Sequence, residues 1–112
     1  MTTEELIKLF KPFGEREFDL QEAVRIVSAN RNIYWSWGVS RAIGVRKMAL
    51  ALRVHGHHHN GYVLITLACN DTFTVRIVTT AGQVLETFTD VYVDQLTEVI
   101  DNRIERIPEY KR

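Results

Sequence analysis

The sequence predicts an α+β domain in which an antiparallel meander of four to five strands is covered on one face by two N-terminal helices and one C-terminal helix. Three observations lead to this prediction. Apolar residues recur at helical spacing near both ends of the chain, they alternate with polar residues in the middle, and turn signals separate the alternating runs. The 112 residues suffice for one hydrophobic core, so we expect a single domain over residues 1–112.

The N-terminal part predicts two short amphipathic helices. Thr2 and Glu5 have the spacing of a capping box, and Pro12 falls where the first helix should end. Asp19 and Glu22 repeat the capping box, so a second helix is expected from there to about residue 30. The apolar stripes of the two helices are Leu6, Phe10 and Phe13, followed by Leu20, Val24 and Val27.

The middle of the chain predicts the first strands. Residues 33–39 are mostly aromatic or β-branched and form the candidate first strand, which decides between four and five strands. Residues 47–55 alternate regularly between polar and apolar, and Asn60-Gly61 is a strong signal for a type I′ hairpin turn.

The pairing across this hairpin has two possible registers. A turn at Asn60-Gly61 places Leu52 opposite Cys69, whereas a four-residue loop ending at Asn60 shifts the pairing by an even number of residues. Both registers therefore sort the side chains onto the same faces. The core face holds Leu50, Leu52, Val54, Val63, Ile65, Leu67 and Cys69, and the other face, expected to be exposed, holds Arg53, His55, Tyr62, Leu64 and Thr66.

The last third predicts two more strands and a helix. Residues 73–77 and 84–89 alternate like the strands before them, and Asp90 is placed to cap a final helix. An antiparallel sheet with one apolar face must be covered, so the three helices are assigned to that face. The stripe of the final helix is Tyr92, Leu96, Val99, Ile100 and Ile104.

The charges are unevenly distributed along the chain. Fourteen basic and fourteen acidic residues give a net charge of zero, yet residues 1–22 sum to −3, residues 23–70 to +6 and residues 71–112 to −3. Such a basic middle block indicates an anionic partner, either nucleic acid or an acidic protein surface. The alternative is that the acidic ends fold back over the basic segment and neutralise it.

The basic block also contains aromatic residues, and this combination gives the candidate site. Bases of single-stranded nucleic acid stack on aromatic rings while Lys and Arg hold the phosphates. A different use of Trp35 and Trp37 is as core residues or as anchors of a homodimer interface in a protein-interaction or self-associating adaptor. The candidate ligand-binding residues are Arg31, Trp35, Trp37, Arg41, Arg46, Lys47 and Arg53.

Four histidines lie close together in the predicted hairpin. On an extended strand His55, His57 and His59 share one face, and imidazole binds zinc and nickel well. The sequence therefore makes these three the candidate metal ligands, with adventitious Zn or Ni as the expected metal and no resident cofactor. The alternative is a solvated hairpin tip whose polar residues are histidines.

The sequence lacks the common motifs of catalytic and cofactor-binding sites, which argues against an enzyme. It has no nucleophile elbow, phosphate-binding glycine loop, dinucleotide fingerprint or pair of zinc-ligating cysteines. We therefore expect a small non-enzymatic binding module. A single Cys, an acidic start without a secretory pattern and no long apolar run favour the cytoplasm and argue against a membrane protein.

Overall fold

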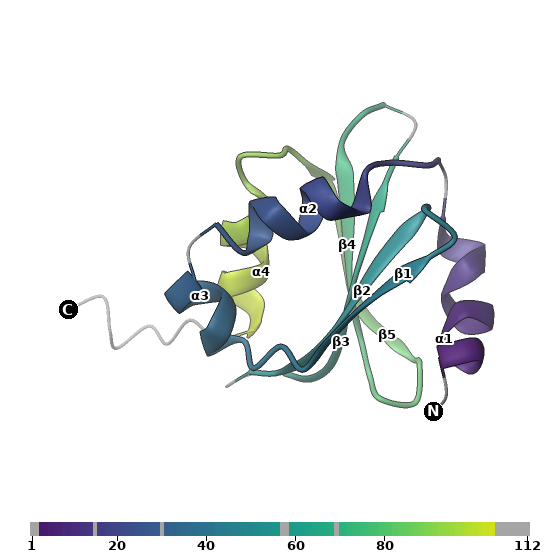
Figure 1. The fold of residues 1–112 in the computed structure, drawn as a ribbon, viewed down its shortest axis with the longest axis horizontal. Helices are drawn as coiled ribbons and strands as arrows, with labels where there is room; N and C mark the ends of the chain where they lie inside the picture. Colours follow the sequence, from purple (N-terminus) through teal and green to yellow (C-terminus); the bar gives the residue numbers. More distant parts are fainter. Residues whose placement is uncertain (1–2, 15, 30, 57–58, 69, 105–112) are drawn as a thin grey trace.

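A computed structural model describes residues 3–14, 16–29, 31–56, 59–68 and 70–104 of the chain. They form one five-stranded antiparallel sheet in the order β1-β2-β3-β4-β5, with helices on both sides (Figure 1). The strands are β1 (Arg41–Val45), β2 (Ala49–His55), β3 (Asn60–Leu67), β4 (Phe73–Val78) and β5 (Val84–Val91). The helices are α1 (Thr3–Phe10), the 3-10 turn η1 (Lys11–Phe13), α2 (Leu20–Val27), α3 (Arg31–Ser36) and α4 (Leu96–Ile104). The predicted α+β class and antiparallel meander are confirmed.

Of the second predicted capping box, the structure shows the hydrogen bonds that Asp19 accepts. Asp19 precedes α2, and its Oδ1 accepts hydrogen bonds from the backbone N–H groups of Gln21 at 3.0 Å and Glu22 at 3.2 Å. These bonds satisfy donors that the first turn of a helix leaves unpaired. The carboxylate of Asp19 is therefore occupied in holding the start of α2.

The register between β2 and β3 differs from both predicted pairings. His55 pairs with Asn60 and Leu52 with Val63, so β2 ends at His55 and β3 begins at Asn60. The difference from the predicted registers is an even number of residues, and the predicted sorting of faces is therefore preserved. The first core cluster contains the predicted Leu50, Leu52, Val54, Val63 and Ile65.

The prediction of a strand at residues 33–39 is wrong. Residues 31–36 form α3, which ends in a turn where the N–H of Gly38 donates to Trp35 O at 2.9 Å, with Gly38 at a φ of 63°. The first strand, β1, instead begins at Arg41, after the end of the predicted strand. Packing of the segment around Trp37 against the core outweighs the preference of aromatic residues for strands.

The prediction that all helices cover one face is wrong for the first helix. α2, α3 and α4 lie on one side of the sheet and α1 lies on the other (Figure 1). Leu6 and Phe10 of α1 pack with Tyr62 and Leu64, which the sequence placed on an exposed face. The physical reason is visible in β3, whose continuous apolar run from Tyr62 to Ile65 is typical of a strand buried on both faces.

None of the helices described is long and apolar enough to cross a membrane.

Candidate binding grooves at the two sheet edges

The two tryptophans of the predicted site lie in different environments. Trp37 has no exposed surface, and its Nε1 donates a hydrogen bond to Oδ1 of Asp101 at 3.0 Å. Trp35 is 75% exposed on α3. Residues two apart share a face on a strand but not on a helix, so the change from strand to helix separates them. Trp37 is a core residue, as the alternative reading of the sequence allowed.

Arg53 is engaged within its own hairpin. Its Nη1 donates to the backbone oxygens of Val54 at 2.7 Å and Gly61 at 3.1 Å, and to Oδ1 of Asn60 at 2.8 Å. The guanidinium also lies over the ring of Tyr62, 5.6 Å from its centroid. These contacts fasten β2 to the start of β3, so Arg53 has a structural role.

Three of the four remaining cations of the predicted site lie at the ends of β1, and the fourth, Arg31, lies on α3. Arg31 is exposed on α3, Arg41 begins β1, and Arg46 and Lys47 follow its last residue. Five extended residues span about 16 Å, which separates Arg41 from the β1–β2 turn. The structure therefore places cations at both ends of this edge instead of in one cluster.

The β1–β2 turn has an unusual backbone. Arg46 and Lys47 have φ values of 51° and 59°, and the N–H of Met48 donates to Val45 O at 2.9 Å, which makes a type I′ turn. Such turns favour Asn-Gly, because positive φ is unfavourable for residues with a long side chain. The N–H of Phe18 donates to Lys47 O at 3.0 Å and ties the turn to the start of α2. Both basic side chains are exposed at the tip.

A groove separates α2 from β1. It has a volume of about 270 Å³ and an almost entirely apolar lining, formed by Leu20, Gln21, Val24, Ala42, Gly44 and Leu50. The small residues of β1 create this space, since a Cβ on Gly44 would lie only 2.9 Å from Cδ1 of Leu20. A second hollow of about 420 Å³ shares Leu20 and Gln21 with the groove and reaches Lys47. Phe18 and Asp19 complete the lining of this second hollow, which adjoins the groove and has one acidic and one basic residue.

The two edge strands differ in regularity. β1 pairs with β2 over five consecutive positions without a break. β5 pairs with β4 through two register shifts. Asp90, which lies between the paired residues Phe88 and Val91 at one of these shifts, has a φ of 56°. Bulges twist an edge strand and hinder pairing with another chain. Among the described strands, β1 is therefore the edge better suited to accept another strand.

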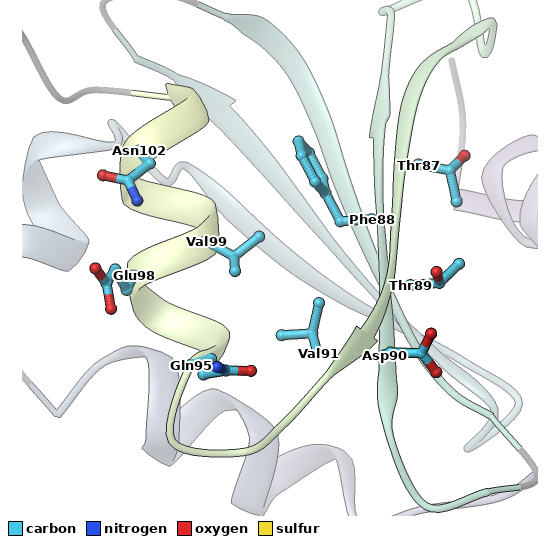
Figure 2. A pocket seen from close by; sticks show the side chains of 9 residues that line it. All are labelled: Thr87, Phe88, Thr89, Asp90, Val91, Gln95, Glu98, Val99 and Asn102. Atoms are coloured by element: carbon cyan, nitrogen blue, oxygen red, sulfur yellow. The ribbon is translucent and has the colours of Figure 1, made fainter.

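A larger groove of about 550 Å³ lies between β5 and α4. Figure 2 shows Phe88 and Val91 of β5 and Val99 of α4 pointing into the space between the strand and the helix. Polar side chains border this apolar floor, and no described Lys or Arg lines it. The bordering residues are Thr87, Thr89, Asp90, Gln95, Glu98 and Asn102. The predicted site did not include this groove, and its signal in the sequence was the acidic block after residue 70.

In the described part of the chain, the histidines of the predicted metal site do not come together. His59 is buried, and its Nε2 lies 3.0 Å from Val78 O and 3.3 Å from Tyr62 O. Carbonyl oxygens only accept, so Nε2 carries the hydrogen. His55 is exposed and His57 falls outside the described residues. No group of three His, Cys, Asp or Glu able to hold a metal occurs in the described part of the chain.

Burial lowers the pKa of the His59 imidazole below its ordinary value, because desolvation disfavours the charged ring. The hydrogen bonds to the backbone of Tyr62 and Val78 oppose this shift, whereas the positive charges of Arg103 and Arg53 add to it. His59 is therefore held as a neutral donor that fixes the β2–β3 loop.

Comparisons with protein-family models, with curated proteins and with solved structures find no match to this chain.

Proposed function

We propose that the protein is a non-enzymatic binding module that holds an extended acidic segment of a partner protein along the edge of β1. The observation that supports this most is the apolar α2–β1 groove beside a regular edge strand that ends in the exposed Arg46-Lys47 turn. The proposal keeps the anionic partner expected from the sequence and relocates its binding site.

The edge and the groove supply complementary parts of such a site. An edge strand presents backbone N–H and C=O groups that an added strand can pair with. Alternate side chains of the added strand then face α2, where Ala42 and Gly44 leave room above Leu50. Backbone pairing provides affinity, and an apolar side chain in the groove provides selectivity.

The charges around the groove favour an acidic occupant. Arg25 follows Gln21 by one helical turn and is exposed, but it does not line the groove. Glu22 instead lines a hollow with Phe73 on the opposite side of α2. Helix α2 therefore holds this carboxylate away from the groove, and Lys47 supplies a cation to the adjoining hollow. Complementary charges speed association and select the partner more than they add affinity.

A protein partner is favoured over nucleic acid because the aromatic platform is incomplete. Binding of single strands uses several exposed rings on which successive bases stack. Trp37 is buried in the core, and Tyr34 is half-buried with its ring centroid 5.8 Å from that of Trp37. Of these three neighbouring rings only Trp35 is well exposed.

Fluorescence anisotropy with three labelled probes tests this function. The probes are a peptide of alternating Glu and Val, its Lys–Val counterpart, and a single-stranded oligothymidylate. We expect the Glu–Val peptide to bind best, and the double variant R46Q/K47Q to bind it about tenfold more weakly because two cations at the end of β1 are lost.

The matched control is K8Q/K11Q, which removes the same charge from exposed positions on α1 and η1. It should bind the peptide like the unmodified protein. Equal losses in the two variants would show a general charge effect and contradict the proposed site. Stronger binding of the oligothymidylate would assign the basic edge to nucleic acid instead.

A further inference from the structure

We infer that the Arg46-Lys47 turn of one copy docks in the β5–α4 groove of a second copy, so that the protein associates head to tail with itself. This inference goes beyond the proposed function: it uses the same Arg46-Lys47 turn but gives it a second partner, a folded groove of another copy in place of an extended segment. It also gives an occupant to the groove shown in Figure 2.

The groove has the chemistry that a basic hairpin tip requires. Phe88, Val91 and Val99 form an apolar floor that the aliphatic stems of Arg and Lys can cover. Asp90 on β5 and Glu98 on α4 are the two carboxylates among the lining residues, and both are exposed. They lie on the outer sides of the strand and the helix, at the rim of the groove (Figure 2), and Oδ1 of Asp90 also accepts a hydrogen bond from Nδ2 of Asn70 at 3.3 Å.

The backbone of the Arg46-Lys47 turn is ordered before any partner binds. Two backbone hydrogen bonds fix it, from Met48 N–H to Val45 O and from Phe18 N–H to Lys47 O. A turn that is ordered before binding loses less conformational entropy when it docks. Arg46 and Lys47 therefore project two positive charges from a defined backbone.

Two exposed apolar residues follow the groove residue Val91 directly and extend the surface that a second copy would cover. They are Tyr92 and Val93, which are 59% and 52% exposed. The N–H of Tyr92 donates to Oε1 of Gln95, one of the groove residues, at 3.3 Å. Clusters of large exposed apolar side chains mark interaction sites more often than single ones do.

The overall charge distribution favours unlike edges over like edges. The chain has a net charge of zero, so copies do not repel one another at long range. A symmetric contact between two β1 edges would bring Arg41, Arg46 and Lys47 of both copies together, and like charges in direct opposition are unfavourable. A head-to-tail contact pairs the basic turn with the acidic groove, and such contacts build rings or filaments.

Sedimentation velocity over a concentration series at low ionic strength tests the contact. We expect concentration-dependent association that about 0.5 M salt reverses, since the contact is largely electrostatic. The variant D90N/E98Q should associate at least about tenfold more weakly. The matched control E4Q/E17Q changes the charge equally at exposed positions outside the groove and should associate like the unmodified protein.

A charge exchange identifies the two contacting surfaces. R46E/K47E has an acidic turn and an acidic groove, and D90K/E98K has a basic turn and a basic groove, so each variant alone should remain monomeric. An equimolar mixture restores both contacts and should associate again. Circular dichroism of each variant first confirms that it is folded. A folded pair that stays monomeric when mixed overturns the inference.

The same variants separate this inference from the proposed function. If the unmodified protein stays monomeric while R46Q/K47Q still weakens binding of the Glu–Val peptide, the self-association is wrong and the binding edge stands. If the peptide does not bind, or R46Q/K47Q does not weaken its binding, the proposed function fails. Association that D90N/E98Q leaves unchanged assigns the contact to another surface and also overturns the inference.

Discussion

Nε1 of Trp37 donates a hydrogen bond to Oδ1 of Asp101 at 3.0 Å, and this contact joins the segment after α3 to α4 across 64 residues of sequence. The indole is buried in the core cluster on the α2–α4 side of the sheet, so it is not available to a ligand. The acidic end of the chain thus folds onto the basic middle segment at this point. The cations along β1 lie at the sheet edge, where α4 does not cover them.

Removing the acceptor of this bond should destabilise the fold. In Asp101→Ala, the buried N–H of Trp37 loses its partner, which costs about 1–3 kcal/mol of unfolding free energy. Asp101→Asn keeps an acceptor oxygen and should recover most of the loss. Urea unfolding measures both, with Asp94→Ala at an exposed position as the control. A similar stability for Asp101→Ala and Asp94→Ala would show that the bond contributes little.

Replacing the β1–β2 turn with Asn-Gly should raise stability and weaken binding. Two non-glycine residues with positive φ cost about 1–2 kcal/mol each, and Asn and Gly tolerate this conformation better. The variant R46N/K47G also removes both cations. Urea unfolding should therefore show a gain of about 1 kcal/mol, while the Glu–Val peptide binds more weakly. A loss of stability would contradict the assignment of the turn, and unchanged binding would contradict its role.

Filling the α2–β1 groove should block binding without unfolding the protein. Ala42 is exposed and lines the groove, so Ala42→Leu places a larger side chain in the space meant for the partner. Thermal unfolding should change little, because exposed substitutions rarely alter stability by more than about 0.5 kcal/mol. Peptide affinity should fall, and Ala81→Leu in the exposed β4–β5 turn should leave it unchanged. Undiminished affinity in a folded Ala42→Leu variant would rule out the groove as the site.

His59 should make stability depend on pH in a defined direction. Its pKa is lower in the folded chain than the unfolded value of about 6.5, so the unfolded chain binds more protons below that pH. The contribution of His59 to stability is therefore present above about pH 6.5 and is lost as the pH falls through the folded pKa. The surrounding positive charges of Arg103 and Arg53 act in the same direction.

Urea unfolding between about pH 7.5 and pH 5 measures this effect. His59→Gln should lose less stability over this range than the unmodified protein, because the titrating group is gone. His55→Gln, at an exposed position, should follow the unmodified protein. Parallel pH profiles for all three proteins would show that the folded environment of His59 does not bias its protonation.

The fold could be predicted from the sequence where local pattern and packing agree. The alternation in β2 and the capping residue Asp19 identified a strand and a helix correctly. The helix at residues 31–36 could not be predicted, because its aromatic residues favour a strand. The contact between Trp37 and Asp101, which holds the end of this segment against α4, depends on the tertiary fold. The second buried face was also missed, although the apolar run of β3 indicated it.

The candidate site could be predicted only as a segment. Arg46 and Lys47 were identified as basic residues, but no local pattern predicted their positive φ or the hydrogen bond from Phe18 N–H to Lys47 O that ties their turn to the start of α2. The groove between β5 and α4 combines residues from two elements that no short motif connects. Both grooves are products of the tertiary fold.

Backbone amide hydrogen exchange with and without the Glu–Val peptide tests the central claim most directly. Pairing of the peptide along β1 should slow exchange at amides among Ala42, Ile43 and Gly44, because an added strand accepts hydrogen bonds from the open edge. Amides of β5 should keep their rates. Exchange at β1 that stays unchanged under saturating peptide, or protection that develops at β5 instead, would contradict the proposed binding edge.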